Sequence, residues 1–164
     1  MKNYLILGLI SVFILTSCAN QRNVNNFYNK YQGTENTMSF KAPLFLASLM
    51  MQDSEDYRMF QDKIKSMRVL TINELSKEKQ LNVQQDIQKA LQLDGFENWF
   101  NLNKDGRIIN ISAQNRGNAL KNIVMSMQGE DQVIFVNAKT NLTENELTKF
   151  ITHMLDEKDD KKND

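Results

Sequence analysis

The sequence predicts a two-layer α+β domain. It is expected to contain a largely antiparallel five-stranded sheet in the order β-α-β-α-β-β-β-α, with helices mainly on one face. Apolar residues alternate between strand and helix periods in the first half of the chain, and three consecutive segments with a period of two follow. A capped amphipathic segment then closes the domain. Helices gathered on one face of an antiparallel sheet give two layers.

The first predicted strand covers Met38 to Ala42, where apolar and polar residues alternate. Pro43 follows and suits the first turn of a helix. A second helix is predicted to begin at Ser54, because two acidic residues come directly after it. Behind this start, helical spacing is kept by Tyr57, Phe60, Ile64 and Met67. Residues 68–73 (RVLTIN) predict the next strand.

Another helix is predicted to begin at Asn82, which forms a capping-box pattern with Gln85, and to end at Gly95. Its apolar positions are Val83, Ile87, Ala90 and Leu91. The aromatic residues after Gly95 have spacing that predicts one further helical turn. These residues are Phe96, Trp99 and Phe100.

The period then changes from helical to two. The alternating segments 107–113, 120–127 and 133–138 predict three strands, and the sequences QNRGN and QGEDQ between them suit antiparallel hairpins. Thr143 and Glu146 form a capping box for a final helix with an apolar stripe.

Composition excludes several kinds of site. The chain has 164 residues with one Cys and one His, so it cannot form an intramolecular disulfide or an ordinary Cys/His metal centre. Its 20 basic and 20 acidic residues cancel, which argues against a nucleic-acid partner. No metal, cofactor or catalytic residue is predicted.

The N-terminal segment is predicted to be a targeting signal. Tyr4 to Leu15 is an apolar run of 12 residues, which is the length of a secretory core and too short to span a bilayer. The run ends in Leu15-Thr16-Ser17-Cys18, which resembles a bacterial lipobox. The resemblance implies cleavage before Cys18 and acylation of its thiol. Because Ala19 follows rather than Asp, the resemblance favours the outer membrane over the inner membrane. Because no acidic cluster follows Cys18, it favours a periplasm-facing domain over one at the cell surface.

The predicted organisation therefore has four parts. Residues 1–17 are a lipoprotein signal peptide, 18–26 a lipid-anchored tether, 27–155 a single α+β domain and 156–164 a charged, disordered tail. The tether is polar and rich in Asn, and the tail (DEKDDKKND) contains only charged residues and one Asn.

Several segments together resemble one family of small bacterial lipoproteins, the domain-of-unknown-function 4252 family. They are the lipobox, FYNKY from residue 27, IKSMRVL at 64–70, GFENW from residue 95, DGRIINIS from residue 105 and VIFV from residue 133. The chain departs from the family at residues 136–142 (VNAKTNL), where a Gly-containing turn is usual. The resemblance implies an envelope lipoprotein with an α+β domain and no established activity.

Two motifs suggest chemistry but have simpler explanations. Residues 101–108 match the outline of a calcium loop, yet Ser112 occupies the position that requires a bidentate acid. An Asp-Gly turn opening a hairpin explains the same letters. His153 has no local Ser or acidic partner, and a helix histidine near a C-terminus is expected there.

One sheet face is the predicted binding surface. Strand alternation places Ile108, Asn110, Val124 and Phe135 on a mixed, weakly polar face that helices on the other side would leave open. The sequence thus predicts a membrane-anchored, periplasm-facing module that binds a protein or another envelope component without catalysis. A small envelope hydrolase using carboxylates, or a carrier of an apolar ligand, remains the alternative.

Overall fold

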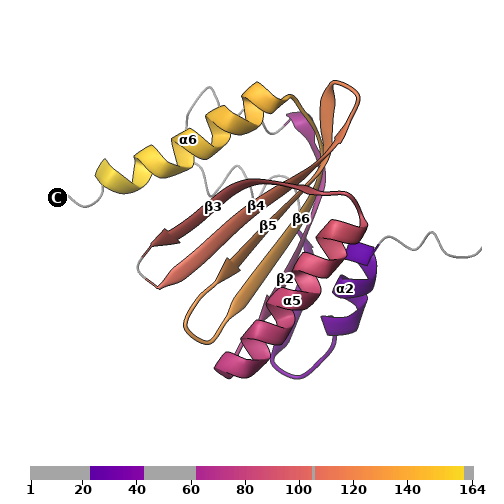
Figure 1. Cartoon of the computed structure of the whole chain (residues 1–164), viewed down its shortest axis with the longest axis vertical. Helices are drawn as coiled ribbons and strands as arrows, with labels where there is room; N and C mark the ends of the chain where they lie inside the picture. Colours follow the sequence, from indigo (N-terminus) through magenta and orange to yellow (C-terminus); the bar gives the residue numbers. More distant parts are fainter. Residues whose placement is uncertain (1–22, 43–61, 105, 161–164) are drawn as a thin grey trace, which may run out of the picture.

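A computed structural model describes residues 23–42, 62–104 and 106–160, the last eight by their backbone alone. Its six strands form one open antiparallel sheet in the order β1-β2-β6-β5-β4-β3. The predicted α+β class with an antiparallel sheet is therefore correct, and the sheet has one strand more than expected. Figure 1 shows α2 beside α5 and α6 well apart from both.

The predicted strands in the second half are confirmed, and each is longer than its sequence pattern indicated. The helices are α2 (Asn23–Tyr31), α5 (Lys77–Leu93) and α6 (Glu144–Asp160). The strands are β1 (Thr37–Ala42), β2 (Ile64–Ile72), β3 (Glu97–Lys104), β4 (Arg107–Arg116), β5 (Ala119–Gln128) and β6 (Val133–Leu142).

The main core lies between one sheet face and the helices α2 and α5. Phe135 of β6 is 1% exposed, and its ring lies 4.7 Å from the ring of Phe27 on α2. Phe27 in turn contacts Tyr31, with ring centroids 4.9 Å apart. The other buried apolar residues of this cluster are Val24, Tyr28, Leu70, Ile72, Val83, Ile87, Ala90, Val124 and Val133. Burial of these side chains is the main force holding the helices on this face.

Helix α6 packs on a second, separate cluster of buried side chains. Leu147 and Ile151 of α6 join Ile111, Ala113 and Leu120 in this cluster. Two of the three described helices thus lie on one face, and α6 lies on the other. The predicted capping box of α6 is present: the Thr143 N–H donates to Glu146 Oε2 at 2.7 Å, and the Glu146 N–H donates to Thr143 Oγ1 at 3.3 Å.

The prediction of a helical turn after Gly95 is wrong, because residues 97–104 form the edge strand β3. This strand pairs with β4 along its length, and a bulge between Asn98 and Phe100 shifts the register. Trp99 and Phe100 consequently pack against the same cluster although they are adjacent in sequence. The bulge therefore produces a spacing of aromatic residues that resembles a helix.

Two further boundaries differ from the predictions. Ile64 and Met67 belong to β2, where Met67 pairs with Ala42 of β1, so the strand begins before residue 68. Helix α5 begins at Lys77, with Ser76 as the N-cap. Its side chain accepts the Lys79 N–H at 3.4 Å, whereas Asn82 lies inside the helix. Ser76 fixes the start because it accepts a free N–H of the first turn.

The described domain also extends beyond its predicted ends. Helix α2 includes residues 23–26 of the predicted tether, and Val24 within it is buried. Helix α6 continues to Asp160, into the predicted tail. The predicted signal peptide, Cys18, and the predicted helices after Pro43 and Ser54 as far as residue 61 lie outside the described residues.

The side chain of Asp94 joins the two helices on the main face. Asp94 is the C-cap of α5, and its carboxylate accepts the backbone N–H groups of Asn23 and Val24 at 2.9 Å each. These N–H groups belong to the first turn of α2, where an acceptor satisfies otherwise free donors. The start of α2 is therefore held against the end of α5.

Candidate functional site

The face that carries the main core becomes polar toward its β3 edge. Cross-strand pairing places Asn101 of β3 opposite Asn110 of β4, which lies opposite Ser126 of β5. A neighbouring row pairs Asn98 with Ser112. The apolar residues of this face lie farther along the same rows, because Ser126 pairs with Phe135 of β6. One sheet face is therefore divided into a buried apolar half and a polar half.

Helix α5 supplies the opposite wall. Gln84, Gln88 and Gln92 recur every four residues, which places them along one side of the helix. Apolar side chains contribute to the same site, namely Ile87 and Leu91 of α5 and Phe96 just after its end. Leu91 and Phe96 also pack against the main core cluster.

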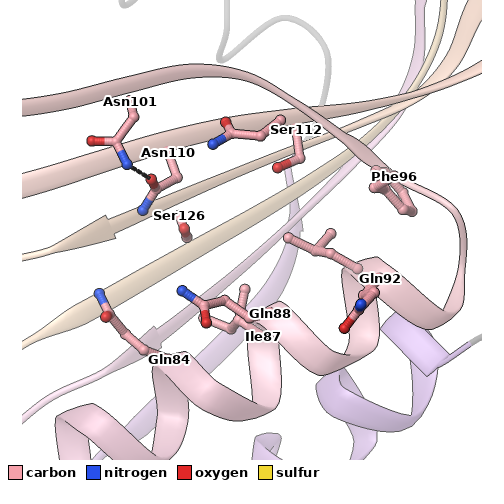
Figure 2. Close-up of a pocket in the computed structure, with 11 residues that line it drawn as sticks. Gln84, Ile87, Gln88, Gln92, Phe96, Asn101, Asn110, Ser112 and Ser126 are labelled. Carbon is pink, nitrogen blue, oxygen red and sulfur yellow. Dashed lines mark hydrogen bonds between the residues drawn. The ribbon is translucent and has the colours of Figure 1, made fainter.

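The two walls enclose a groove of about 360 Å³, which we call the amide groove. Figure 2 shows Gln84, Gln88 and Gln92 on the helix side and Asn101, Asn110 and Ser126 on the sheet side. Its lining residues are Gln84, Ile87, Gln88, Leu91, Gln92, Phe96, Asn98, Asn101, Asn110, Ser112 and Ser126. Every one is an amide, a hydroxyl or an apolar side chain, so the lining carries no formal charge.

Hydrogen bonds fix one end of the amide groove. Gln84 Nε2 donates to Gln128 Oε1, whose own amide donates to Gln80 Oε1 at 2.7 Å. Gln80, which is 3% exposed, donates in turn to the carbonyl of Glu130 at 2.6 Å. This relay joins α5 to the β5–β6 turn, and it holds Gln84 in one orientation.

The sheet wall is ordered by a second hydrogen bond. Asn101 Nδ2 donates to Asn110 Oδ1 at 2.7 Å, as the dashed line in Figure 2 marks. Because Asn110 Oδ1 accepts this bond, its Nδ2 group is left to donate elsewhere. In Figure 2 this nitrogen is directed toward Ser126 and the glutamines of α5.

Other lining side chains have no such support. Within the described part of the chain, no hydrogen bond is made by the side chains of Gln88, Gln92, Asn98, Ser112 and Ser126. Ser112 and Ser126 are 7% and 9% exposed, and buried hydroxyl groups normally have a partner. These groups are available to a molecule that enters the groove.

The structure separates the four residues predicted to form a binding surface. Asn110 lines the amide groove, and Ile108 is half-buried two residues away on the same strand. Val124 and Phe135 are each 1% exposed beneath α2 and α5. The expectation that this face is open to solvent is therefore wrong for these two residues, because helices cover the half of the face where they lie.

Sequence reasoning missed the helix wall of the groove. The four-residue spacing of Gln84, Gln88 and Gln92 was visible in the sequence, but glutamines on a surface helix have no distinguishing feature by themselves. Their significance depends on the asparagines of β3, a strand that the sequence pattern did not predict.

The calcium-like segment is a hairpin, as predicted. Lys104 pairs with Arg107, and Gly106 has a φ of 72°, in the left-handed region that favours glycine. His153 lies on α6, and its side chain is outside the described part. In the described ranges, no group of three or more His, Cys, Asp or Glu residues could hold a metal ion. No helix there is both long and apolar enough to cross a membrane.

A smaller hollow of about 170 Å³ between α2 and α5 is lined in part by the charged residues Lys30, Asp86 and Lys89. Asp86 accepts hydrogen bonds from Lys30 at 2.5 Å and from the Tyr31 hydroxyl at 2.6 Å. Burial raises the pKa of Asp86, but these hydrogen bonds outweigh it and hold the pKa below its ordinary value. Burial, followed by the bond to Asp86, raises the pKa of Tyr31. These groups satisfy one another and fasten α2 to α5.

Fold and site together define a small α+β domain with an uncharged, hydrogen-bonding groove between a helix and the edge of its sheet. Residues 27–150 match the family model described as a domain of unknown function, DUF4252, and the chain belongs to this family. No curated protein matches the chain. No solved structure matches it either.

Proposed function

We propose that this protein is a lipid-anchored module of the bacterial envelope that binds a ligand in the amide groove without catalysis. The observation that carries the proposal is the lining of this groove. Its polar atoms are uncharged, several have no partner in the described chain, and they face one another across a concave site of about 360 Å³. Volumes of roughly 300–1,000 Å³ are typical of small-molecule sites.

The chemistry of the lining favours binding over a reaction. Ser112 and Ser126 would need an adjacent base to act as nucleophiles, and none of the eleven lining residues is a His, Lys, Asp or Glu. A carboxylate hydrolase would need acidic side chains at the site. An apolar ligand would remove water from the amides without replacing their hydrogen bonds, which is costly. We therefore favour a polar, uncharged ligand over the two alternatives.

The anchor rests on the sequence alone. If Cys18 is acylated, four residues lie between it and Asn23, the start of α2, so five residue-to-residue steps join the two. An extended chain of that length reaches at most about 18 Å. Because Asp94 holds the start of α2 next to the end of α5, the end of the groove near Gln92 would lie close to the bilayer surface.

The anchor is tested by membrane fractionation and acyl labelling of the wild type and Cys18→Ala. Acylated wild-type protein in the membrane fraction and release of the variant are expected. Failure of the wild type to take up acyl label would refute the anchor.

The binding site is tested in cells by photo-crosslinking. A photoreactive amino acid is introduced at the position of Gln88, which is exposed and lines the groove. The matched control places it at Gln85, another exposed glutamine of α5 outside the lining. Crosslinked products formed from position 88 but not from position 85 support the proposal. Identical products from both positions would refute the groove as the binding site.

A further inference from the structure

We infer that the ligand of the amide groove is a neutral saccharide, an inference that rests on the proposed function. A sugar presents hydroxyl groups that both donate and accept hydrogen bonds along its edge, and C–H groups on its ring faces. The groove offers both kinds of complementary group, namely carboxamides and hydroxyls that donate and accept, and the apolar side chains of Ile87, Leu91 and Phe96.

The polar lining matches hydroxyl groups better than ions. Each carboxamide has one acceptor oxygen and a donor NH₂ group, and each serine hydroxyl can do either. Six carboxamides and two hydroxyls line the groove. A phosphate or carboxylate ligand would find no countercharge among these residues, although charge-assisted bonds are the main source of affinity for such groups. A ligand with uncharged donors and acceptors can pair with either wall.

The apolar part of the lining suits one face of a sugar ring. Phe96 and Leu91 line the groove and are half-buried, and Ile87, which also lines it, is buried. In Figure 2 the ring of Phe96 lies at the end of the groove next to Gln92. An aromatic ring beside planar amides can contact the C–H face of a sugar while the amides bind its hydroxyls. A wholly polar groove would lack this contact.

Part of the site is already ordered for binding. Gln84 is held by the relay through Gln128, and Asn110 is held by Asn101. These bonds reduce the side-chain entropy that would otherwise be lost when a ligand binds. Ser112 and Ser126 are buried and have no partner in the described residues, so they add preformed hydrogen-bonding groups at the base of the sheet wall.

An extended peptide is the principal rival, because β3 is an edge strand that pairs only with β4 among the described strands. A peptide added to this edge would bind through the backbone groups of β3. It would not require the glutamines on α5, which line the groove from the other side. The contribution of these glutamines therefore distinguishes the two ligands.

The test is an NMR titration of the full chain in a detergent that has no sugar headgroup. The probes are N,N′-diacetylchitobiose and cellobiose, with and without acetamido groups, and an extended neutral peptide. The side-chain NH₂ signals of Gln88, Gln92 and Asn98 are monitored together with the backbone amides of β3. We expect at least one saccharide at millimolar concentration to shift the side-chain signals.

A double variant, Gln88→Ala with Gln92→Ala, should weaken saccharide binding by about 10- to 100-fold, since each of the two lost hydrogen bonds is worth about a factor of three to ten. Both side chains are exposed and make no hydrogen bond within the described chain, so the fold should survive. The control Gln85→Ala should bind as the wild type does.

The saccharide assignment is overturned if neither saccharide shifts any signal and the peptide shifts only the β3 backbone amides. That result would still support a binding module, with a peptide as its ligand. Equal binding by the double variant and the wild type would also overturn it. If the photo-crosslinker at position 88 captures nothing that position 85 does not, the proposed function fails as well. The two failures are therefore distinguishable.

Discussion

Replacing Asp94 by alanine should lower the free energy of unfolding by about 2 kcal/mol. The carboxylate of Asp94 accepts the N–H groups of Asn23 and Val24 at 2.9 Å each, and the Asn23 side-chain amide at 3.2 Å. An N-cap substitution costs about 0.5–2 kcal/mol, and a hydrogen bond to a charged group contributes about 1.5–3 kcal/mol. These ranges overlap near 2 kcal/mol, and the partial exposure of these bonds supports a value no higher.

The assay is urea unfolding at neutral pH, followed by circular dichroism, with hydrogen exchange of the α2 amides as a local readout. Asp94→Asn keeps one acceptor oxygen and should lose about 1 kcal/mol. Glu35→Ala is the charge-matched control; Glu35 is exposed, and we expect a change within about 0.5 kcal/mol. If Asp94→Ala unfolds within about 0.5 kcal/mol of the wild type, the cap does not hold α2 in place.

Two further predictions concern α6 and the main core. Hydrogen bonding from the Thr143 N–H lowers the pKa of Glu146, so this stabilisation is complete above the ordinary carboxyl pKa and is lost as pH falls through the lowered value. Unfolding curves measured from neutral to acidic pH should show this loss of stability for the wild type and not for Glu146→Gln. If the free energy of unfolding of both proteins falls in parallel with pH, the reasoning is contradicted. Phe135→Ala should cost about 3–5 kcal/mol, because the ring is buried. Phe40 is 41% exposed, so Phe40→Ala should lower the free energy of unfolding much less. Equal losses for the two variants in urea unfolding would show that Phe135 is not a core residue.

Local sequence patterns were sufficient to predict the elements that are stabilised by contacts among their own residues. The Thr143–Glu146 box fixes the start of α6 through bonds between residues three apart, so the sequence alone could predict it. Strands β4 to β6 could be predicted because successive side chains of a strand point to opposite faces of the sheet, and in β5 every second residue from Leu120 to Ser126 is buried. Strand β3 escaped prediction because its bulge places two adjacent aromatic residues against one cluster.

The candidate site was predicted only at Asn110. Alternation placed Asn110, Val124 and Phe135 on one face, and the register agrees, since Asn110 pairs with Ser126, which pairs with Phe135. Alternation cannot indicate which part of a face a helix covers. The positions of α2 and α5 decide that Phe135 is a core residue and that Asn110 lines the groove.

The sequence by itself determined the α+β class, the β4–β6 meander, the cap of α6 and the family, because these depend on short-range periods and on recognisable segments. Tertiary structure decided the rest. The Asp94 cap joins groups 70 residues apart, and the amide groove joins glutamines of α5 to asparagines of β3 and β4 and serines of β4 and β5. Such contacts depend on where packed elements lie in space, and no local pattern of residues records that position.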